Sequence, residues 1–370
     1  MKPLKNKFIF STGGTGGHIF PALATADALR KLEPNAEILF IGANNRMEMD
    51  KVPHHGYPII GLPIQGIQRK LTLKNLIVPF KIFFSLCKAK RIIKKFKPEV
   101  VVGFGGYASG AVLRKAAKMK IPTIIQEQNS FPGLTNRFLA KKAKLICVAY
   151  SGMEKYFNPE KIILTGNPIR SEIFSNSTTS EKGKKFFGLD SEKLTILAIG
   201  GSLGARTINE SINKILPEIA AKNYQIIWQT GRNYNYTPSK QIEPEKIQNI
   251  FVHDFIFEMP QAYAAADIII SRAGAIAVSE IIAMAKPVIF IPSPNVTDDH
   301  QTKNATALVN QNAAILLKDS EAYELLGEVL FDLIDDENKR NEMSNNLKKL
   351  AMPNAAEKIA EKILELRENK

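Results

Sequence analysis

Long apolar runs and cysteines are what this sequence most clearly lacks. No segment approaches the roughly 18 uninterrupted apolar residues of a membrane-spanning helix, which argues against an integral membrane protein. Only two of the 370 residues are cysteines, and Cys87 and Cys147 lie in apolar stretches far apart, which favours reduced core thiols over a disulfide or a metal site. The first residues contain no hydrophobic signal region, so we expect the protein to stay in the cytosol.

Acidic residues are absent between Asp50 and Glu99, a stretch that holds eleven Lys and Arg. The imbalance extends over residues 1–170, which hold 28 Lys and Arg against nine Asp and Glu, a net charge of +19, whereas residues 171–370 carry −5. A half-molecule this basic attracts polyanions, so a nucleic acid and an anionic bilayer surface are the partner classes to weigh.

Short, continuous β-branched runs alternate with helical patterns through both halves of the chain. This alternation predicts two doubly wound, Rossmann-like α/β domains that face each other across a cleft, each with a parallel sheet covered on both sides. We place the domains at 1–167 and 168–350, take the polar stretch 171–193 as the linker region, and expect the C-terminal helix, 351–370, to join the first domain. The expected strands are 8–11, 38–41, 100–102, 122–125, 145–148 and 162–164, then 195–199, 225–228, 250–252, 267–270, 287–291 and 314–317.

Three glycine-rich turns, at 13–18, 103–107 and 200–205, each follow an expected strand where a helix should begin. Glycine lets the backbone approach a ligand closely, and the helix that follows directs free N–H groups at it. None of the turns completes a dinucleotide or P-loop motif. They predict phosphate- or sugar-binding turns at the carboxyl edge of each sheet, the alternative being that the glycines only permit tight turns.

Together these and other motifs resemble the peripheral-membrane N-acetylglucosaminyltransferases of bacterial peptidoglycan synthesis, which have the GT-B fold. The motifs are GGTGGH at 13–18, GFGGY at 103–107, EQN at 127–129, GLTN at 133–136, GNPIR at 166–170, GGSLGAR at 200–206, FI at 255–256, SRAGA at 271–275, SE at 279–280 and DHQ at 299–301. The chain departs from the family pattern at Ala111, where proline is common, at Gln126, where histidine is frequent, and at His300, where some relatives have glutamine.

The resemblance implies inverting transfer of GlcNAc from UDP-GlcNAc to the 4-hydroxyl of undecaprenyl-pyrophosphoryl-MurNAc-pentapeptide. It implies no cofactor and no metal, and the adjacent Asp298 and Asp299 are typical of a helix cap or a solvated turn. It also places the enzyme peripherally on the cytoplasmic face of the bacterial membrane, with anionic lipids and other cell-wall synthesis proteins as partners and no nucleic acid.

The family's substrate contacts carry over onto matching positions. Ser202 and Arg170 are expected at the diphosphate, Glu280 at the ribose, the main chain of Ile256 at the uracil, and Gln301 at the sugar. A surface glutamate is the alternative for Glu280. The remaining expected substrate-binding residues are Thr15, Gly16, Gly17, Tyr107, Asn129, Asn136, Ala275 and His300.

His18 and Glu127 are the candidates for the general base. Histidine titrates near neutral pH, and a helix N-terminus favours its neutral form, so His18 in the first helical turn can accept a proton. A purely structural histidine is the alternative, and Glu127 is the competing base.

Residues 73–96 predict a helix with two apolar faces. One face should pack on the sheet, whereas Leu73, Ile77, Phe80 and Phe84 form a second face bordered by basic residues that include Lys81 and Lys88. Apolar rings surrounded by lysines are typical of a helix that lies on a bilayer surface, the alternative being contact with a neighbouring helix.

Three other functions compete with this interpretation. A UDP-sugar 2-epimerase or a transferase acting on another lipid would share the architecture, but the motifs at 127–129 and 133–136 argue against both. A nucleic-acid-binding protein would use the basic first half, yet aromatic residues interleaved with basic ones at the right spacing are lacking.

Overall fold

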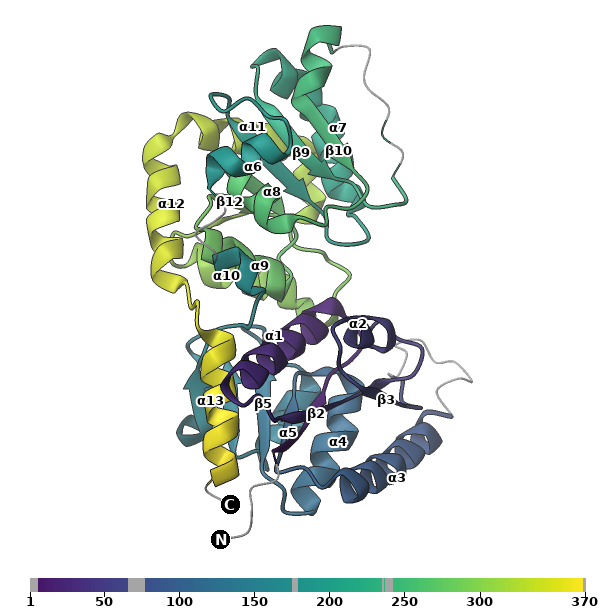
Figure 1. The fold of residues 1–370 in the computed structure, drawn as a ribbon. Coiled ribbons are helices and arrows are strands. Elements are labelled where there is room, and N and C mark those ends of the chain that lie inside the picture. The colour runs from purple at the N-terminus through teal and green to yellow at the C-terminus, as the bar shows by residue number, and fades with distance from the viewer. Residues whose placement is uncertain (1–5, 66–76, 175–178, 235, 237–241, 369–370) are drawn as a thin grey trace. The chain divides into compact units, whose positions relative to one another are not determined.

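The computed structural model describes residues 6–65, 77–174, 179–234, 236 and 242–368, and the chain forms two compact units (Figure 1). Unit 1 comprises Met1–Arg170 and Met352–Lys370, and unit 2 comprises Ser171–Ala351. Each unit contains one sheet in which every pairing is parallel. The prediction of two Rossmann-like α/β domains is therefore confirmed.

The sheet of unit 1 has seven strands in the order β3-β2-β1-β4-β5-β6-β7. They are β1 (Lys7–Ser11), β2 (Glu37–Ala43), β3 (Ile59–Leu62), β4 (Val100–Gly103), β5 (Thr123–Glu127), β6 (Leu145–Val148) and β7 (Ile162–Leu164). The central strands β1 and β4 are buried on both faces, as continuous Val, Ile and Phe runs predict. β3 was not predicted from the sequence, because four residues between two prolines at a sheet edge give too short a pattern.

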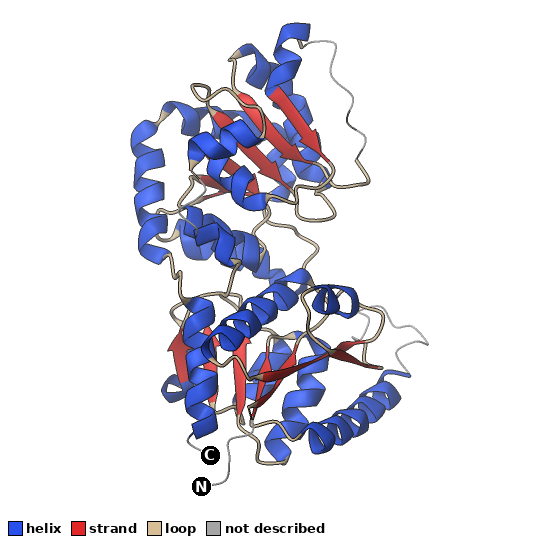
Figure 2. Cartoon of the chain, in the orientation of Figure 1, coloured by secondary structure: helices blue, strands red, loops and turns tan. Residues whose placement is uncertain are grey.

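Helices cover both faces of this sheet (Figure 2). Side chains of α1 and α13 share one apolar core with one face of the sheet, and those of α3, α4 and α5 share a second core with the other face. α2 packs against β2 and β3. The bounds are α1 (Gly16–Leu32), α2 (Glu48–His54), α3 (Val78–Phe96), α4 (Gly106–Lys118), α5 (Leu134–Ala140) and α13 (Ala355–Glu368), with short 3-10 turns η2 (Met153–Lys155) and η3 (Pro159–Lys161).

The C-terminal helix α13 packs beside α1, although the two are separated by most of the chain (Figure 1). Ile359, Ala360 and Ile363 are buried in the core that α1 shares with the sheet. The Arg367 guanidinium lies 2.9 Å from the Glu33 carboxylate and donates to Asn6, so the last described turn is fastened to the start of the domain.

The sheet of unit 2 has six strands in the order β10-β9-β8-β11-β12-β13. They are β8 (Thr195–Ile199), β9 (Gln225–Gln229), β10 (Ile250–His253), β11 (Ile268–Ser271), β12 (Val288–Phe290) and β13 (Ile315–Leu316). α7 and α11 share the main apolar core with the sheet. The helices are α6 (Ser180–Phe186), α7 (Arg206–Ala221), α8 (Met259–Ala265), α9 (Ala275–Met284), α10 (His300–Val309), α11 (Asp319–Asp335) and α12 (Glu337–Leu350), with 3-10 turns η4 (Ser171–Phe174), η5 (Pro244–Asn249) and η6 (Thr297–Asp299).

The interpretation of residues 171–193 as a linker was wrong. The segment contains α6, which packs on α8 so closely that a Cβ on Gly183 would lie 2.6 Å from the Ala265 nitrogen. The Lys184 side chain is buried and donates to the carbonyl oxygens of Ser191 and Lys193. The charge of this segment was interpreted as solvent exposure, but the Lys184 ammonium group is satisfied by these main-chain acceptors and by the Asp267 carboxylate, 3.3 Å away, instead of by water.

The two cysteines differ from each other. Cys147 is buried in β6, as predicted, and burial raises the pKa of its thiol to about 12, so this thiol stays protonated. Cys87 is exposed on α3, and the prediction that it is a core thiol was wrong.

Candidate functional site

The first glycine turn, between β1 and α1, is built around a buried carboxylate that the sequence did not single out. Glu48 accepts hydrogen bonds from the Gly14 N–H at 3.1 Å and the Ala43 N–H at 2.9 Å, and its side chain is fully buried. A Cβ on Gly13 would lie 2.8 Å from a Glu48 oxygen, so the turn needs glycine there. Of the predicted residues, Thr15 is the N-cap of α1 without a side-chain capping bond, and Gly16 and Gly17 open the helix.

His18 lies in the first turn of α1, and two other loops of unit 1 contact its ring. The ring rests against Gly105, where a Cβ would lie 2.7 Å from the ring carbon Cε1 and 2.8 Å from Nδ1. The Nδ1 atom is 3.2 Å from the Gln128 Oε1 atom. Gly105 also has a φ of +94°, so glycine is required there for two independent reasons.

Glu127, the last residue of β5, organises the loop that follows. Its Oε1 accepts from the Asn129 main-chain N–H at 3.0 Å, and its Oε2 accepts from Asn136 at 2.8 Å and the Gly133 N–H at 3.2 Å. Burial raises the pKa of this carboxyl group, and these hydrogen bonds oppose the rise. The structure thus brings the predicted residues Asn129 and Asn136 together on one carboxylate.

The other two predicted residues of unit 1 lie on different segments. Tyr107 is the second residue of α4, and its side chain is 56% exposed. Arg170 is the last residue of the N-terminal part of unit 1 and is partly buried.

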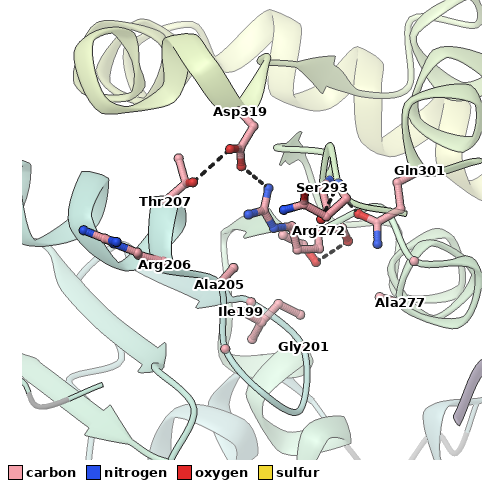
Figure 3. Close-up of a pocket in the computed structure, with 15 residues that line it drawn as sticks. Ile199, Gly201, Ala205, Arg206, Thr207, Arg272, Ala277, Ser293, Gln301 and Asp319 are labelled. Carbon is pink, nitrogen blue, oxygen red and sulfur yellow. Dashed lines mark hydrogen bonds and ion pairs between the residues drawn. The ribbon is translucent and has the colours of Figure 1, made fainter. Parts of the chain in front are cut away.

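Unit 2 contains a pocket of about 540 Å³ at the carboxyl ends of β8 and β11 (Figure 3). It is lined by Ile199, Gly200, Gly201, Gly204, Ala205, Arg206, Thr207, Ser271, Arg272, Gly274, Ala277, Ser293, Asn295, Gln301 and Asp319. This is the edge at which open α/β sheets bind ligands.

Two helix N-termini contribute to this pocket. α7 begins at Arg206 and α9 begins at Ala275, and their N-cap residues, Ala205 and Gly274, make no side-chain capping hydrogen bond. A helix start leaves main-chain N–H groups unpaired and carries partial positive charge, so it favours an anion. Gly204 has a φ of +77°, and a Cβ there would lie 2.0 Å from the Thr230 oxygen, which explains why this turn needs glycine.

The pocket also holds a charged group that the sequence analysis missed (Figure 3). Arg272 donates to the Ile291 carbonyl at 2.9 Å and the Pro292 carbonyl at 3.1 Å, and it is paired with Asp319. Asp319 also accepts from the Thr207 hydroxyl at 2.9 Å. The motif containing Arg272 was recognised without a role for the arginine, and no local signal links it to Asp319.

The predicted residue Gln301 lines the pocket, and its orientation is fixed. Its Oε1 accepts from the Ser293 N–H at 2.9 Å, so its NH₂ group is the part that can donate to a ligand (Figure 3). His300 is the first residue of α10, just before Gln301. Ser202 and Ala275 are sequence neighbours of the lining residues Gly201 and Gly274.

A second buried amide joins the glycine turn to the segment predicted to contact uracil. Gln229, at the end of β9, donates to the Gly201 carbonyl at 2.9 Å and accepts from the Ile256 N–H at 2.9 Å. Glu280 lies within α9, is buried, and accepts from the Tyr263 hydroxyl at 3.1 Å. The alternative of a surface glutamate is therefore wrong for Glu280.

Among the described residues, no group of three or more His, Cys, Asp or Glu is placed to hold a metal ion. Asp299 is the N-cap of α10, and its carboxylate accepts from the Thr302 hydroxyl at 2.6 Å.

The outer face of α3 is apolar, as predicted, and larger than predicted. The exposed fractions of Ile77, Phe80 and Phe84 are 54%, 67% and 60%, and Phe83, which the prediction omitted, is 62% exposed. Leu73 lies outside the described residues. No described helix is long and apolar enough to cross a membrane.

The two lysines expected beside this face are partly engaged within the protein. Lys81 donates to Gln65 and Lys88 donates to the Gly61 carbonyl, each at 2.7 Å. α4 contacts α3, and α5 contacts α4. These two helices also expose Leu134 (71% exposed), Phe138 (65% exposed) and Arg114, whose guanidinium lies 5.9 Å from the Phe138 ring centroid.

Comparison with known proteins agrees with this geometry. Residues 8–148 match the glycosyltransferase family 28 N-terminal domain and residues 195–359 match the family 28 C-terminal domain. A UDP-N-acetylglucosamine--N-acetylmuramyl-(pentapeptide) pyrophosphoryl-undecaprenol N-acetylglucosamine transferase of Flavobacterium psychrophilum is 51% identical over 98% of both chains. The transferase of the same name from Bacteroides fragilis is 51% identical over 97% of this chain and 95% of its own.

Solved structures show the same fold. MurG of Acinetobacter baumannii superposes with a TM-score of 0.74 at 30% identity, covering 97% of this chain and 99% of its own. UDP-GlcNAc 2-epimerase from Neisseria meningitidis, bound to UDP-GlcNAc, has a TM-score of 0.67 at 16% identity over 97% of this chain and 100% of its own, which is a likeness of fold alone. The chain belongs to glycosyltransferase family 28, among the UDP-N-acetylglucosamine--N-acetylmuramyl-(pentapeptide) pyrophosphoryl-undecaprenol N-acetylglucosamine transferases.

Proposed function

We propose that this chain transfers GlcNAc from UDP-GlcNAc to the MurNAc 4-hydroxyl of undecaprenyl-pyrophosphoryl-MurNAc-pentapeptide, forming the lipid-linked disaccharide used for peptidoglycan. Relatives named for this reaction are about half identical over nearly the whole chain. The observation that carries the donor half is the unit 2 pocket, where two uncapped helix starts offer positive potential to an anion, beside Arg272 with its partner Asp319.

In the donor half, the departing diphosphate is the group that needs stabilisation. Main-chain N–H groups at the starts of α7 and α9 stabilise its developing charge, with Ser202 and Arg170 as additional donors. The NH₂ group of Gln301 and its neighbour His300 serve the neutral sugar, because amides bind hydroxyls without charge. Glu280 binds the ribose, the Ile256 main chain binds the base, and Ala275 contributes at the start of α9.

In the acceptor half, the reaction needs a group that takes the proton of the attacking hydroxyl. The acceptor oxygen bonds to the anomeric carbon, the bond from that carbon to the phosphate oxygen breaks, and UDP leaves with the electron pair. We assign the role of proton acceptor to His18, because both Glu127 oxygens already accept hydrogen bonds from the loop that follows β5. The other acceptor-side residues are Thr15, Gly16, Gly17, Tyr107, Asn129 and Asn136.

Titration calorimetry with UDP-GlcNAc and UDP-glucose tests the proposed donor. We expect UDP-GlcNAc to bind more tightly, with GlcNAc appearing on a lipid-linked MurNAc-pentapeptide acceptor in a transfer assay. Equal affinity for both sugars together with no transfer would contradict the assignment.

The membrane surface is the second part of the proposal. We propose that the exposed side chains of α3, together with those of α4 and α5, lie on an anionic bilayer at the cytoplasmic face, where the lipid-linked acceptor resides. The three helices pack on the same face of the sheet, and exposed Arg91, Lys94 and Arg114 accompany the apolar side chains. This combination suits insertion of rings among headgroups and contact of cations with anionic lipid.

Vesicle flotation tests this surface. The double variant Phe80→Asp/Phe84→Asp should lose recovery with vesicles that contain anionic phosphatidylglycerol, because carboxylates cannot enter the headgroup boundary and are repelled by it. Tyr323→Asp in unit 2, where the tyrosine is 48% exposed, is the control and should float as the wild type does. Unchanged flotation of the double variant would reject the surface.

A further inference from the structure

The contact between His18 and Gln128 bears on the position of the His18 ring and on which of its two nitrogens carries the proton. Gln128 is buried, and its Oε1 lies 3.2 Å from the His18 Nδ1. Either nitrogen of a neutral imidazole can carry the proton, and either end of a glutamine amide can face it. The direction of this hydrogen bond therefore has to come from the groups that hold the amide.

Main-chain carbonyl oxygens set that direction, because they can only accept. The Gln128 Nε2 donates to the Phe104 carbonyl at 2.9 Å, so this end of the amide must be the NH₂ group. Turning the amide over would place its oxygen against the Phe104 oxygen and leave two buried acceptors facing each other. The opposite end, which faces His18, is therefore the amide oxygen.

A second chain of hydrogen bonds gives the same result from an independent starting point. The Asn167 Nδ2 donates to the Gln128 main-chain carbonyl at 3.0 Å, so the Asn167 Oδ1 is left to accept from the Gln126 Nε2 at 2.9 Å. The Gln126 Oε1 then faces the Gln128 Nε2 as an acceptor. Both chains orient Gln128 identically, and all three amides are buried.

We infer that Gln128 is a positioning residue that holds neutral His18 in its Nδ1–H form and so makes Nε2 the atom that accepts the proton of the attacking hydroxyl. An amide oxygen can only accept, so the Nδ1 must donate and the lone pair must lie on Nε2. Gly105 allows the His18 ring to lie beside the Gln128 amide oxygen, since a Cβ at position 105 would displace the ring. The catalytic part of the inference rests on the proposed role of His18.

Nuclear magnetic resonance of the full chain, labelled with ¹⁵N in its histidines, tests the tautomer without any activity. Long-range ¹H–¹⁵N correlations distinguish a protonated ring nitrogen from an unprotonated one, and the His18→Gln variant identifies the His18 signals among the five histidines. We expect the wild type at neutral pH to show a protonated Nδ1 and an unprotonated Nε2. An Nε2–H form in the wild type would overturn the inference.

The Gln128→Met variant, which keeps the side-chain length and removes the acceptor, tests the positioning role. We expect the Nδ1–H form to lose its predominance and kcat to fall about 10- to 100-fold, while UDP binding in unit 2 changes less than about twofold. The control is Gln225→Met, which removes another buried glutamine, at the start of β9 in unit 2, and should leave the His18 tautomer as in the wild type.

The outcomes separate the two claims. A His18 tautomer unchanged in Gln128→Met would overturn the role of Gln128. A changed tautomer with wild-type kcat would overturn the assignment of Nε2 as proton acceptor, and with it the proposed role of His18, while leaving the hydrogen-bond assignment intact. If Gln128→Met does not fold, the wild-type spectrum still decides the tautomer.

Discussion

The two units place similar glycine turns at the carboxyl ends of their first strands, but different side chains of the protein hold the two turns. In unit 1 the Gly14 N–H donates to the buried carboxylate of Glu48. In unit 2 the Gln229 amide donates to the Gly201 carbonyl instead, and the turn opens into a pocket with Arg272. The same local motif is therefore held by a carboxylate in one unit and by an amide in the other, and we propose an anion site only for the turn in unit 2.

The largest effect expected from this comparison is that of His18→Ala. Loss of the proposed proton acceptor should reduce transfer by about 10²- to 10⁴-fold, the usual contribution of a general base. UDP binding, which we propose for unit 2, should be retained in calorimetry. Wild-type turnover would remove the role assigned to His18.

Glu48→Ala tests whether the carboxylate holds the glycine turn of unit 1. The main-chain N–H groups of Gly14 and Ala43 would lose their partner, which should lower the free energy of unfolding by about 2–4 kcal/mol. Urea unfolding measures the loss, and Asp50→Ala on the exposed side of α2 is the control. Equal stability of the two variants would show that the carboxylate does not hold the turn.

Arg272→Met tests the anion site of unit 2. Loss of a charged donor should weaken UDP binding by about 10- to 100-fold in calorimetry. Arg206→Met is the matched control at the same pocket, because this side chain is 87% exposed and pairs with Glu210, and its effect should stay below about threefold. Similar effects of the two variants would mean that Arg272 has no special place in the pocket.

Gln229→Leu tests whether the amide holds the glycine turn of unit 2. The glycine turn and the Ile256 segment would lose the amide that joins them, so UDP affinity should fall by about 3- to 10-fold. Gln225→Leu, at the opposite end of the same strand, should leave the affinity unchanged. An unaltered affinity in Gln229→Leu would show that the two segments hold their places without it.

The smallest effect concerns a second histidine, His253 in β10, whose Nε2 is buried without a hydrogen-bond partner. Burial lowers the pKa of His253 below its usual value, so the unfolded chain binds a proton more readily than the folded one. His253 therefore does not reduce the free energy of unfolding above about pH 6.5. Below that pH, the free energy of unfolding falls as the pH drops toward the pKa of His253 in the folded protein. Urea unfolding at pH 7.5 and 5.5 should show a smaller loss for His253→Gln than for the wild type, and an equal loss would contradict this.

The sheets could be predicted from the sequence because their central strands are continuous apolar runs that only a sheet covered on both faces can bury. The prediction failed where burial involves polar groups or few residues. The segment with Gly183 and Lys184 in α6 was predicted to be a linker, because close backbone packing and a buried ammonium group give no apolar pattern in the sequence. The edge strand β3 is too short to give one.

The glycine turns of the site could also be located from the sequence. The polar side chains that hold these turns and their neighbouring residues in place could not. Glu48 and Asp319 act on atoms 34 and 47 residues away in the chain, and nothing local in the sequence distinguishes them from other polar residues. Gln128 lies in the EQN motif, but its contact with His18, 110 residues away, could not be predicted from that motif. Resemblance supplied the ligand roles, but the orientation of an amide depends on contacts that only a folded chain specifies.

The return of α13 to unit 1 bears on how the enzyme can be divided for study. A fragment ending at Arg170 would contain every strand of the first sheet yet expose the groove in which Ile359 and Ile363 are otherwise buried. Short deletions from the carboxyl terminus should therefore harm the half of the protein that the ribosome makes first. Supplying 352–370 as a separate peptide is the natural way to rescue such a fragment.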